Sequence, residues 1–133
     1  MILVDSSAWI DYYSNPKSDI STQLRSIISN APENIVIPNI VVTEVLQGIR
    51  NDNVYNDIKD SLLSYTIFCG ISVNIYTDAA EIYRSCRKKG ITINSTIDTI
   101  IASIALDNNL EILTADNDFY NIARLYPIRF YKA

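Results

Sequence analysis

Residues 1–7 carry the stretch that decides the class of fold, Met1-Ile2-Leu3-Val4-Asp5-Ser6-Ser7. The three apolar residues at positions 2–4 are suited to a buried strand in the middle of a sheet. The two serines can cap a helix, which is expected to continue until Asn15-Pro16 stops it. Asp5 stands directly after the strand, where parallel sheets form their binding sites. This order of strand, acid and helix indicates an α/β protein.

Short strands alternate with helices along the rest of the sequence. Strands are expected at residues 35–37, 110–114 and 128–131, and helices at residues 18–30, 39–49, 53–65, 77–89, 96–108 and 116–125. Residues 66–75 have strand character but no clear assignment. This alternation, without a long linker or an internal repeat, predicts a three-layer α/β/α sandwich with a mainly parallel central sheet. The 133 residues are expected to form a single domain, residues 1–133.

The composition indicates a protein with a sizeable core and no membrane segment. Apolar residues make up 48% of the chain and charged residues 20%, which excludes a disordered protein. No apolar run approaches the roughly 20 residues that a membrane-spanning helix needs. The N-terminus lacks the basic segment and the long apolar stretch of a secretory signal. We therefore expect a cytoplasmic protein.

The residue types narrow the possible chemistry. The sequence contains no histidine, which excludes Ser-His-Asp and Cys-His schemes and most catalytic zinc sites. Cys69 and Cys86 are expected to be ordinary buried thiols. Carboxylates are abundant, with 15 Asp and Glu against 11 Lys and Arg and a net charge of −4. An enzyme of this composition is expected to use carboxylates and hard cations.

Two acids follow predicted strands. Asp5 follows residues 2–4, and Asp116 follows residues 110–114, with Asp118 close behind. Each has a local explanation, because Asp5 and Asp116 can cap the next helix and Asp118 can complement its positive end. The carboxyl ends of parallel strands also meet at one edge of a sheet, which favours a shared site.

Two further acids lie on predicted helices. Asp98 falls on the apolar face of its helix, where an unpaired carboxylate is costly to bury. The alternative is a capping box, in which Asp98 folds back onto the helix start at Ser95. Glu44 borders the apolar arc of its helix, where a glutamate is usually a solvated flanking residue. Taken singly, neither acid establishes a site.

Together, these acids predict a metal site. Like charges from four segments cluster stably only if a cation holds them or if some stay protonated. Mg²⁺ or Mn²⁺ suits such oxygen ligands. A metal ion held in this way lowers the pKa of bound water and neutralises charge on a phosphoryl group. This chemistry cleaves phosphodiester bonds without a histidine.

Four stretches of the sequence carry a family resemblance. They are Met1-Ile2-Leu3-Val4-Asp5-Ser6-Ser7-Ala8-Trp9-Ile10, Val42-Thr43-Glu44-Val45-Leu46-Gln47-Gly48-Ile49, Ile97-Asp98-Thr99-Ile100-Ile101-Ala102 and Ile112-Leu113-Thr114-Ala115-Asp116-Asn117-Asp118-Phe119. Through them the chain resembles the PIN-domain ribonucleases, most closely the VapC toxins of type II toxin–antitoxin systems. The resemblance implies a PIN-like fold and a Mg²⁺-dependent endoribonuclease that leaves 3′-hydroxyl and 5′-phosphate ends. It also implies a VapB-like antitoxin as partner and a homodimer.

The resemblance also implies roles for single residues. The acidic quartet of the family corresponds to Asp5, Glu44, Asp98 and Asp116. Asp5 and Asp98 are the expected principal metal ligands, Asp116 completes the metal-binding cluster, and Glu44 holds or activates the attacking water. The supporting polar positions correspond to Ser7, Thr114 and Asp118, of which Asp118 is also an alternative to Asp116.

A basic cluster precedes Asp98 in the sequence: Arg84, Arg87, Lys88 and Lys89. It has two interpretations, a solvated helix end whose cations complement the helix dipole or a patch that contacts RNA phosphates. Bases of single-stranded RNA stack on aromatic side chains, and nine tyrosines are available, although most are expected in the core or at interfaces. The expected substrate is tRNA or ribosomal RNA.

Three alternatives stay open at this point. An inactive PIN-like domain could act as a protein-binding module, although clustered acids would bring no benefit to a scaffold. A phosphoryl-accepting receiver domain also groups acids at strand ends, but it needs a lysine that residues 128–131 lack. A structure-specific DNA nuclease would use the same chemistry, and the short chain without an added helical clamp favours RNA.

Overall fold

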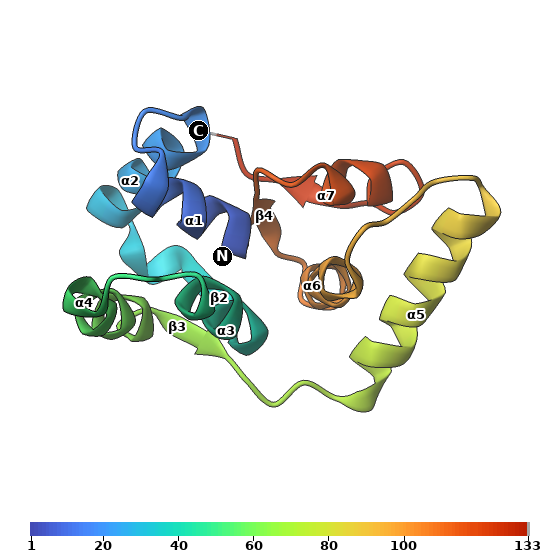
Figure 1. Cartoon of the computed structure of the whole chain (residues 1–133). Helices are drawn as coiled ribbons and strands as arrows, with labels where there is room; N and C mark the ends of the chain where they lie inside the picture. Colours follow the sequence, from blue (N-terminus) through green and yellow to red (C-terminus); the bar gives the residue numbers. More distant parts are fainter. Residues whose placement is uncertain (133) are drawn as a thin grey trace.

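Five parallel strands form the middle of the structure (Figure 1), a computed structural model that describes residues 1–132. Their order in the sheet is β3-β2-β1-β4-β5. The strands are β1 (Ile2–Val4), β2 (Ile35–Pro38), β3 (Thr66–Phe68), β4 (Glu111–Leu113) and β5 (Arg129–Phe130). The central strand β1 pairs through Leu3 with Val36 of β2 and with Ile112 of β4. All residues of β1 and β2 are buried, as expected for strands that are covered on both faces.

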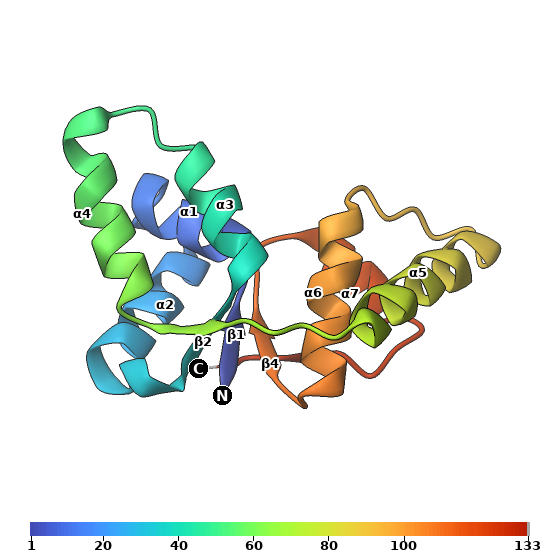
Figure 2. The ribbon, with the colours of Figure 1, turned by 90° about the horizontal axis from the view of Figure 1, so that it is seen from below.

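Seven α-helices cover the sheet. They are α1 (Ser6–Ser14), α2 (Asp19–Asn30), α3 (Asn39–Gln47), α4 (Asp52–Leu63), α5 (Val73–Lys88), α6 (Thr96–Asp107) and α7 (Asn117–Ile122), with a short 3₁₀ helix, η1 (Pro32–Asn34). Figure 2 shows α1 to α4 on one side of the strands and α5 to α7 on the other. The predicted three-layer α/β/α sandwich on a parallel sheet is therefore confirmed.

The strand order singles out the point between β1 and β4. From β1 the chain builds outward through β2 to β3, and it then crosses to the other side of β1 for β4 and β5. The direction of winding therefore reverses between β1 and β4. In open α/β sheets, ligands bind beyond the carboxyl ends of the strands at such a reversal point.

The core on the α1–α4 side is built around Trp9. This side chain is fully buried, and its ring lies 5.4 Å from the ring of Tyr65 and 6.3 Å from that of Tyr13. Leu24 of α2 and Leu62 of α4 belong to the same buried cluster. This packing fixes α1, whose first turn carries site residues.

The structure changes some predicted boundaries. Helix α5 begins at Val73 rather than at residue 77, because Ile75 is buried and its carbonyl accepts a hydrogen bond from Ser103 Oγ (2.9 Å). Residues 66–75 thus contain both β3 and the first turn of α5. Cys86 is buried as expected, but the prediction for Cys69 is wrong: it is exposed, just after edge strand β3.

Two further observations concern the whole chain. Across residues 1–132, none of the helices has the length and apolar character that crossing a membrane requires. Ala133, the last residue of the predicted domain, lies outside the described residues.

Candidate metal centre

Asp5 lies at the carboxyl end of β1 and caps α1. Its Oδ2 atom accepts hydrogen bonds from Ser7 Oγ (2.7 Å), Thr114 Oγ1 (3.0 Å) and the Ser7 amide (3.4 Å). Its Oδ1 atom is buried and has no hydrogen-bond partner. Burial raises the pKa of Asp5, and the hydrogen bonds from Ser7 and Thr114 oppose the rise. The capping interpretation is thus confirmed for one oxygen, and the other oxygen is left for a ligand.

Ser7 and Thr114 connect the ends of β1 and β4. Besides contacting Asp5, Ser7 Oγ accepts a hydrogen bond from the Ala115 amide (2.9 Å). Thr114 Oγ1 accepts one from the Asp116 amide (3.0 Å). The Asp5 amide donates to the Leu113 carbonyl (3.0 Å). The two hydroxyls therefore fix the position of Asp5 relative to the loop that carries Asp116.

Asp98, in the first turn of α6, points into the protein. The residue is only 5% exposed, and its Oδ2 atom has no hydrogen-bond partner. Burial raises the pKa of Asp98, and hydrogen bonding with Asp118 and the charge of Asp5 raise it further, to about 9. The capping-box alternative is wrong, because the Ser95 amide donates instead to Asp118 Oδ2 (3.1 Å).

Asp118 holds the loop that leads into α6. Its Oδ2 atom accepts hydrogen bonds from the amides of Asn94 (2.9 Å) and Ser95 (3.1 Å), and its Oδ1 atom accepts one from Asn94 Nδ2 (3.2 Å). Asn94 is not among the site residues that the sequence predicts. No local pattern pointed to it, because its partner lies 24 residues away along the chain. The carboxylate of Asp118 therefore positions the residues that precede Asp98.

Asp116 caps α7 and faces the same site. Its Oδ1 atom accepts a hydrogen bond from the Asp118 amide (2.9 Å), as the capping interpretation expects. One carboxylate oxygen from each of Asp98, Asp116 and Asp118 lies within 4.8 Å of the others. This spacing would allow the three side chains to share one metal ion.

Glu44 reaches the site from α3. Its side chain is half-buried, and its Oε1 atom is buried without a hydrogen-bond partner. Burial raises the pKa of Glu44, and the charges of Asp5 and Asp116 add to the rise. The structure therefore brings the four predicted acids, from β1, α3, α6 and α7, within electrostatic range of one another.

The donor set fits a divalent metal ion. Among residues 1–132, three buried carboxylate oxygens lack any hydrogen-bond partner: Asp5 Oδ1, Glu44 Oε1 and Asp98 Oδ2. Burying an unpaired carboxylate is costly, so such oxygens indicate either bound protons or a cation. Oxygen ligands without nitrogen or sulfur favour hard cations such as Mg²⁺, Mn²⁺ or Ca²⁺.

The predicted basic cluster lies on the last turns of α5. Arg84, Arg87, Lys88 and Lys89 are all exposed. Figures 1 and 2 place this end of α5 at the outer edge of the molecule, and residues 89–95 lead back to the start of α6. Arg84 lines a groove together with Thr96 and Thr99 of α6. Thr99 directly follows Asp98 in the sequence. Of the four cations, Arg84 thus lines a groove that reaches α6, the helix that carries Asp98.

Known proteins share both the sequence and the fold. Residues 2–125 match the PIN domain family. The chain is 31% identical over 128 residues to the ribonuclease VapC11 of Mycobacterium tuberculosis H37Rv. The aligned region covers 94% of this chain and 93% of that protein. The structure resembles VapBC-1 from nontypeable Haemophilus influenzae (TM-score 0.75, 18% identity, 99% and 98% of the two chains). It also resembles VapBC2 from Rickettsia felis bound to a promoter DNA fragment (TM-score 0.72, 20% identity, 98% of each chain). The chain belongs to the PIN-domain family, in the branch of the VapC ribonucleases.

Proposed function

We propose that this protein is a metal-dependent endoribonuclease and the toxin of a toxin–antitoxin pair. The observation that supports this most strongly is the set of three buried carboxylate oxygens without hydrogen-bond partners, on Asp5, Glu44 and Asp98. A bound cation would compensate their charge. Membership of the VapC ribonucleases supports RNA as the substrate.

Asp5, Asp98 and Asp116 would hold the metal ion, either Mg²⁺ or Mn²⁺. When bound, such an ion lowers the pKa of water and offsets charge on the phosphoryl group. Ser7 and Thr114 keep Asp5 in place through their hydroxyls. Asp118 keeps the start of α6 in place through Asn94 and Ser95, and so positions Asp98.

Glu44 would act as the base that takes a proton from the attacking water. A general base works best when its pKa lies near the operating pH. Burial and two neighbouring carboxylates raise the pKa of Glu44 in that direction. Attack of the water on phosphorus would break the bond to the 3′ oxygen, which takes up a proton from solvent water and leaves as a 3′-hydroxyl. The other product carries a 5′-phosphate.

Membership of the family also supports a setting for the reaction. The substrate would be tRNA or ribosomal RNA in the cytoplasm, and Arg84, Arg87, Lys88 and Lys89 would contact its phosphates. A VapB-like antitoxin would block the acidic site, and two copies of the chain would form a homodimer. The whole sequence, residues 1–133, would act as one PIN-like nuclease domain.

The deciding experiment compares RNA cleavage by the wild type, Asp5→Asn and Asp98→Asn in Mg²⁺. Each substitution keeps the side-chain size but removes a charged ligand, so cleavage is expected to fall by at least about 100-fold. Asp57→Asn, which changes an exposed acid on α4, is the matched control and should cleave like the wild type. A chelator should stop wild-type cleavage, and circular dichroism should show that all variants are folded.

Two results would contradict the proposal. If the folded wild type cleaves no RNA in Mg²⁺ or Mn²⁺, a protein-binding module becomes the better explanation. If single-stranded DNA is cut as fast as RNA, the protein is a less selective nuclease.

A further inference from the structure

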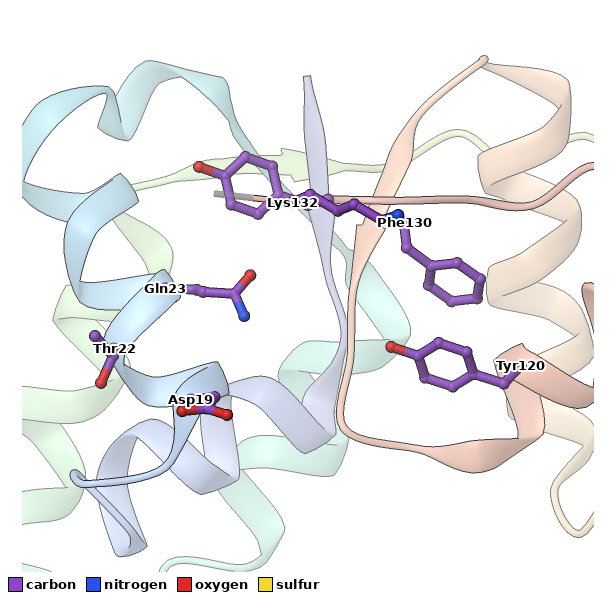
Figure 3. Close-up of a pocket in the computed structure, with 7 residues that line it drawn as sticks. Asp19, Thr22, Gln23, Tyr120, Phe130 and Lys132 are labelled. Carbon is purple, nitrogen blue, oxygen red and sulfur yellow. The ribbon is translucent and has the colours of Figure 1, made fainter.

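A cavity of about 580 Å³ lies between α2, α7 and the C-terminal strand region, and the proposed mechanism gives it no role. Helix α2 contributes Asp19, Thr22 and Gln23, α7 contributes Tyr120, and the C-terminal strand region contributes Phe130 and Lys132 (Figure 3). In Figure 3 the amide of Gln23 and the hydroxyl of Tyr120 point toward each other from opposite sides. The volume falls within the range of about 300–1,000 Å³ that is usual for ligand sites.

One wall of the cavity is an aromatic platform. The rings of Tyr120 and Phe130 are stacked, with centroids 4.2 Å apart and planes within 8° of parallel. Tyr120 is nevertheless 50% exposed, so Phe130 covers one face of its ring and leaves other parts accessible. A stacked, flat and accessible ring suits the π-face of a nucleobase.

The opposite wall carries several hydrogen-bonding groups. The amide of Gln23 offers both donors and an acceptor, which match the mixed edge of a base. Asp19 adds an acceptor and Thr22 a hydroxyl, and both residues are exposed. Lys132 supplies a cation for a phosphate. An apolar helix of a protein partner would leave these polar groups unpaired.

The position of the cavity connects it to the acids. Asp116 caps α7, and Tyr120 lies four residues further along the same helix, which is about 6 Å of helix rise. Strand β5 pairs with Glu111 and Ile112 of β4 but not with Leu113, the last residue of β4. It therefore ends before the loop that carries Asp116. One RNA strand could therefore reach both the metal centre and the cavity.

We propose that this cavity binds one unpaired nucleotide of the RNA, with its base stacked on Tyr120 and its edge bonded to Gln23. The inference rests on the proposed nuclease function and makes the cavity the element that selects the cleavage site. It also gives a net acidic protein a contribution to RNA affinity from base stacking and base hydrogen bonds, in addition to that of its cations.

The test measures binding without cleavage. The Asp5→Asn protein, in a chelator, is titrated with a single-stranded RNA decamer and with the four nucleoside 5′-monophosphates. Adding Tyr120→Ala should weaken decamer binding roughly 5- to 150-fold, the usual effect of losing one stacked base. Tyr120→Phe should bind like the parent, because it keeps the ring. Tyr55→Ala, which removes a tyrosine from α4, is the control and should also bind like the parent. Gln23→Leu should change the order of preference among the four monophosphates.

The outcomes separate this inference from the nuclease proposal. Unchanged binding in both Tyr120→Ala and Gln23→Leu overturns the nucleotide site. Unchanged RNA binding together with weakened antitoxin binding also overturns it and makes the cavity a protein contact. If the expected losses occur but the wild type cuts no RNA in Mg²⁺, the nucleotide site stands and the nuclease proposal fails.

Discussion

Thr114 illustrates how one hydroxyl supports the metal centre. It contacts Asp5 Oδ2 and accepts a hydrogen bond from the Asp116 amide, so it touches two of the proposed metal ligands. Thr114→Val keeps the shape of the side chain and removes both hydrogen bonds. Removing a residue that hydrogen-bonds to a metal ligand typically lowers metal affinity or activity by about 10- to 100-fold. We therefore expect Thr114→Val to need about 10 to 100 times more Mg²⁺ than the wild type for half-maximal cleavage.

Thr114→Ser is the control for this prediction, because it keeps the hydroxyl and should stay close to the wild type. An unchanged Mg²⁺ dependence in Thr114→Val would show that the hydroxyl has no part in metal binding. Thermal unfolding of both variants separates that effect from a general loss of stability.

Asp98 should make the stability of the metal-free protein fall as the pH rises. Its pKa is 3.8 in a model peptide and about 9 in the folded protein. Between these values the folded state holds the proton more tightly than the unfolded state does. The free energy of unfolding therefore decreases with increasing pH, by at most about 1.4 kcal/mol per pH unit for one group.

Thermal unfolding from pH 5 to pH 8 in a chelator measures this effect. The wild type should lose stability across the range, and Asp98→Asn, which carries no charge, should lose less. Mg²⁺ should flatten the wild-type profile, because it binds the deprotonated form. A wild-type profile that rises with pH would contradict the prediction.

The sequence predicted the inward direction of Asp98 but not the residues that hold it. Helical periodicity placed Asp98 on the apolar face, and its 5% exposure confirms this. The positions of Asn94 and Ser95, which precede Asp98, depend on Asp118. Its carboxylate accepts hydrogen bonds from their backbone amides, 24 and 23 residues away along the chain. Such contacts exist only in the folded chain, so local patterns could not reveal the role of Asn94.

Among the helices, α7 and the start of α6 are connected through Asp118, whose carboxylate accepts hydrogen bonds from the amides of Asn94 and Ser95. Asp118→Ala would leave the amides of Asn94 and Ser95 without their acceptor. Hydrogen bonds to a charged group contribute about 1.5–3 kcal/mol each, but Asn94 is exposed and water can replace part of the loss. We expect the free energy of unfolding of the metal-free protein to fall by about 2–3 kcal/mol in urea denaturation.

Asp107→Ala, at the exposed end of α6, is the matched control and should change stability by less than about 0.5 kcal/mol. Hydrogen exchange should accelerate at the amides of Asn94 and Ser95 in Asp118→Ala. Equal stability of the two variants would mean that the connection between α6 and α7 does not depend on Asp118.

Most elements could be predicted because each has a strong local signal, and the exceptions show where that signal fails. Residues 66–75 combine the edge strand β3 with the start of α5, and neither part has a clear periodicity. The packing of Ile75 and its bond from Ser103 settle the assignment. Helix α7 ends at Ile122 rather than at residue 125, because Arg124 and Leu125 form turns.

At the scale of the whole molecule, the distribution of charge decides how RNA approaches. The net charge is −4, and several of the acids converge near the carboxyl ends of β1 and β4. The end of α5, which carries the basic cluster in the sequence, lies at the outer edge of the molecule in Figures 1 and 2. Composition gave the net charge, but only the fold separates the two regions. An acidic centre with cations at a distance favours steering of the RNA backbone from outside the site.

Replacing Arg84, Arg87, Lys88 and Lys89 by glutamine tests this steering. Each phosphate contact with a single strand contributes about 0.7 to the slope of log affinity against log salt, so four contacts contribute up to about 3. The matched control replaces four other cations, Lys17, Arg25, Arg50 and Lys59, and gives the same net charge. If the α5 cluster binds RNA, its variant should lose most of the slope while the control keeps it. Mg²⁺ affinity should stay the same in both variants, because neither set lies among the proposed metal ligands. Equal slopes in both variants would mean that overall charge, rather than this cluster, attracts the RNA.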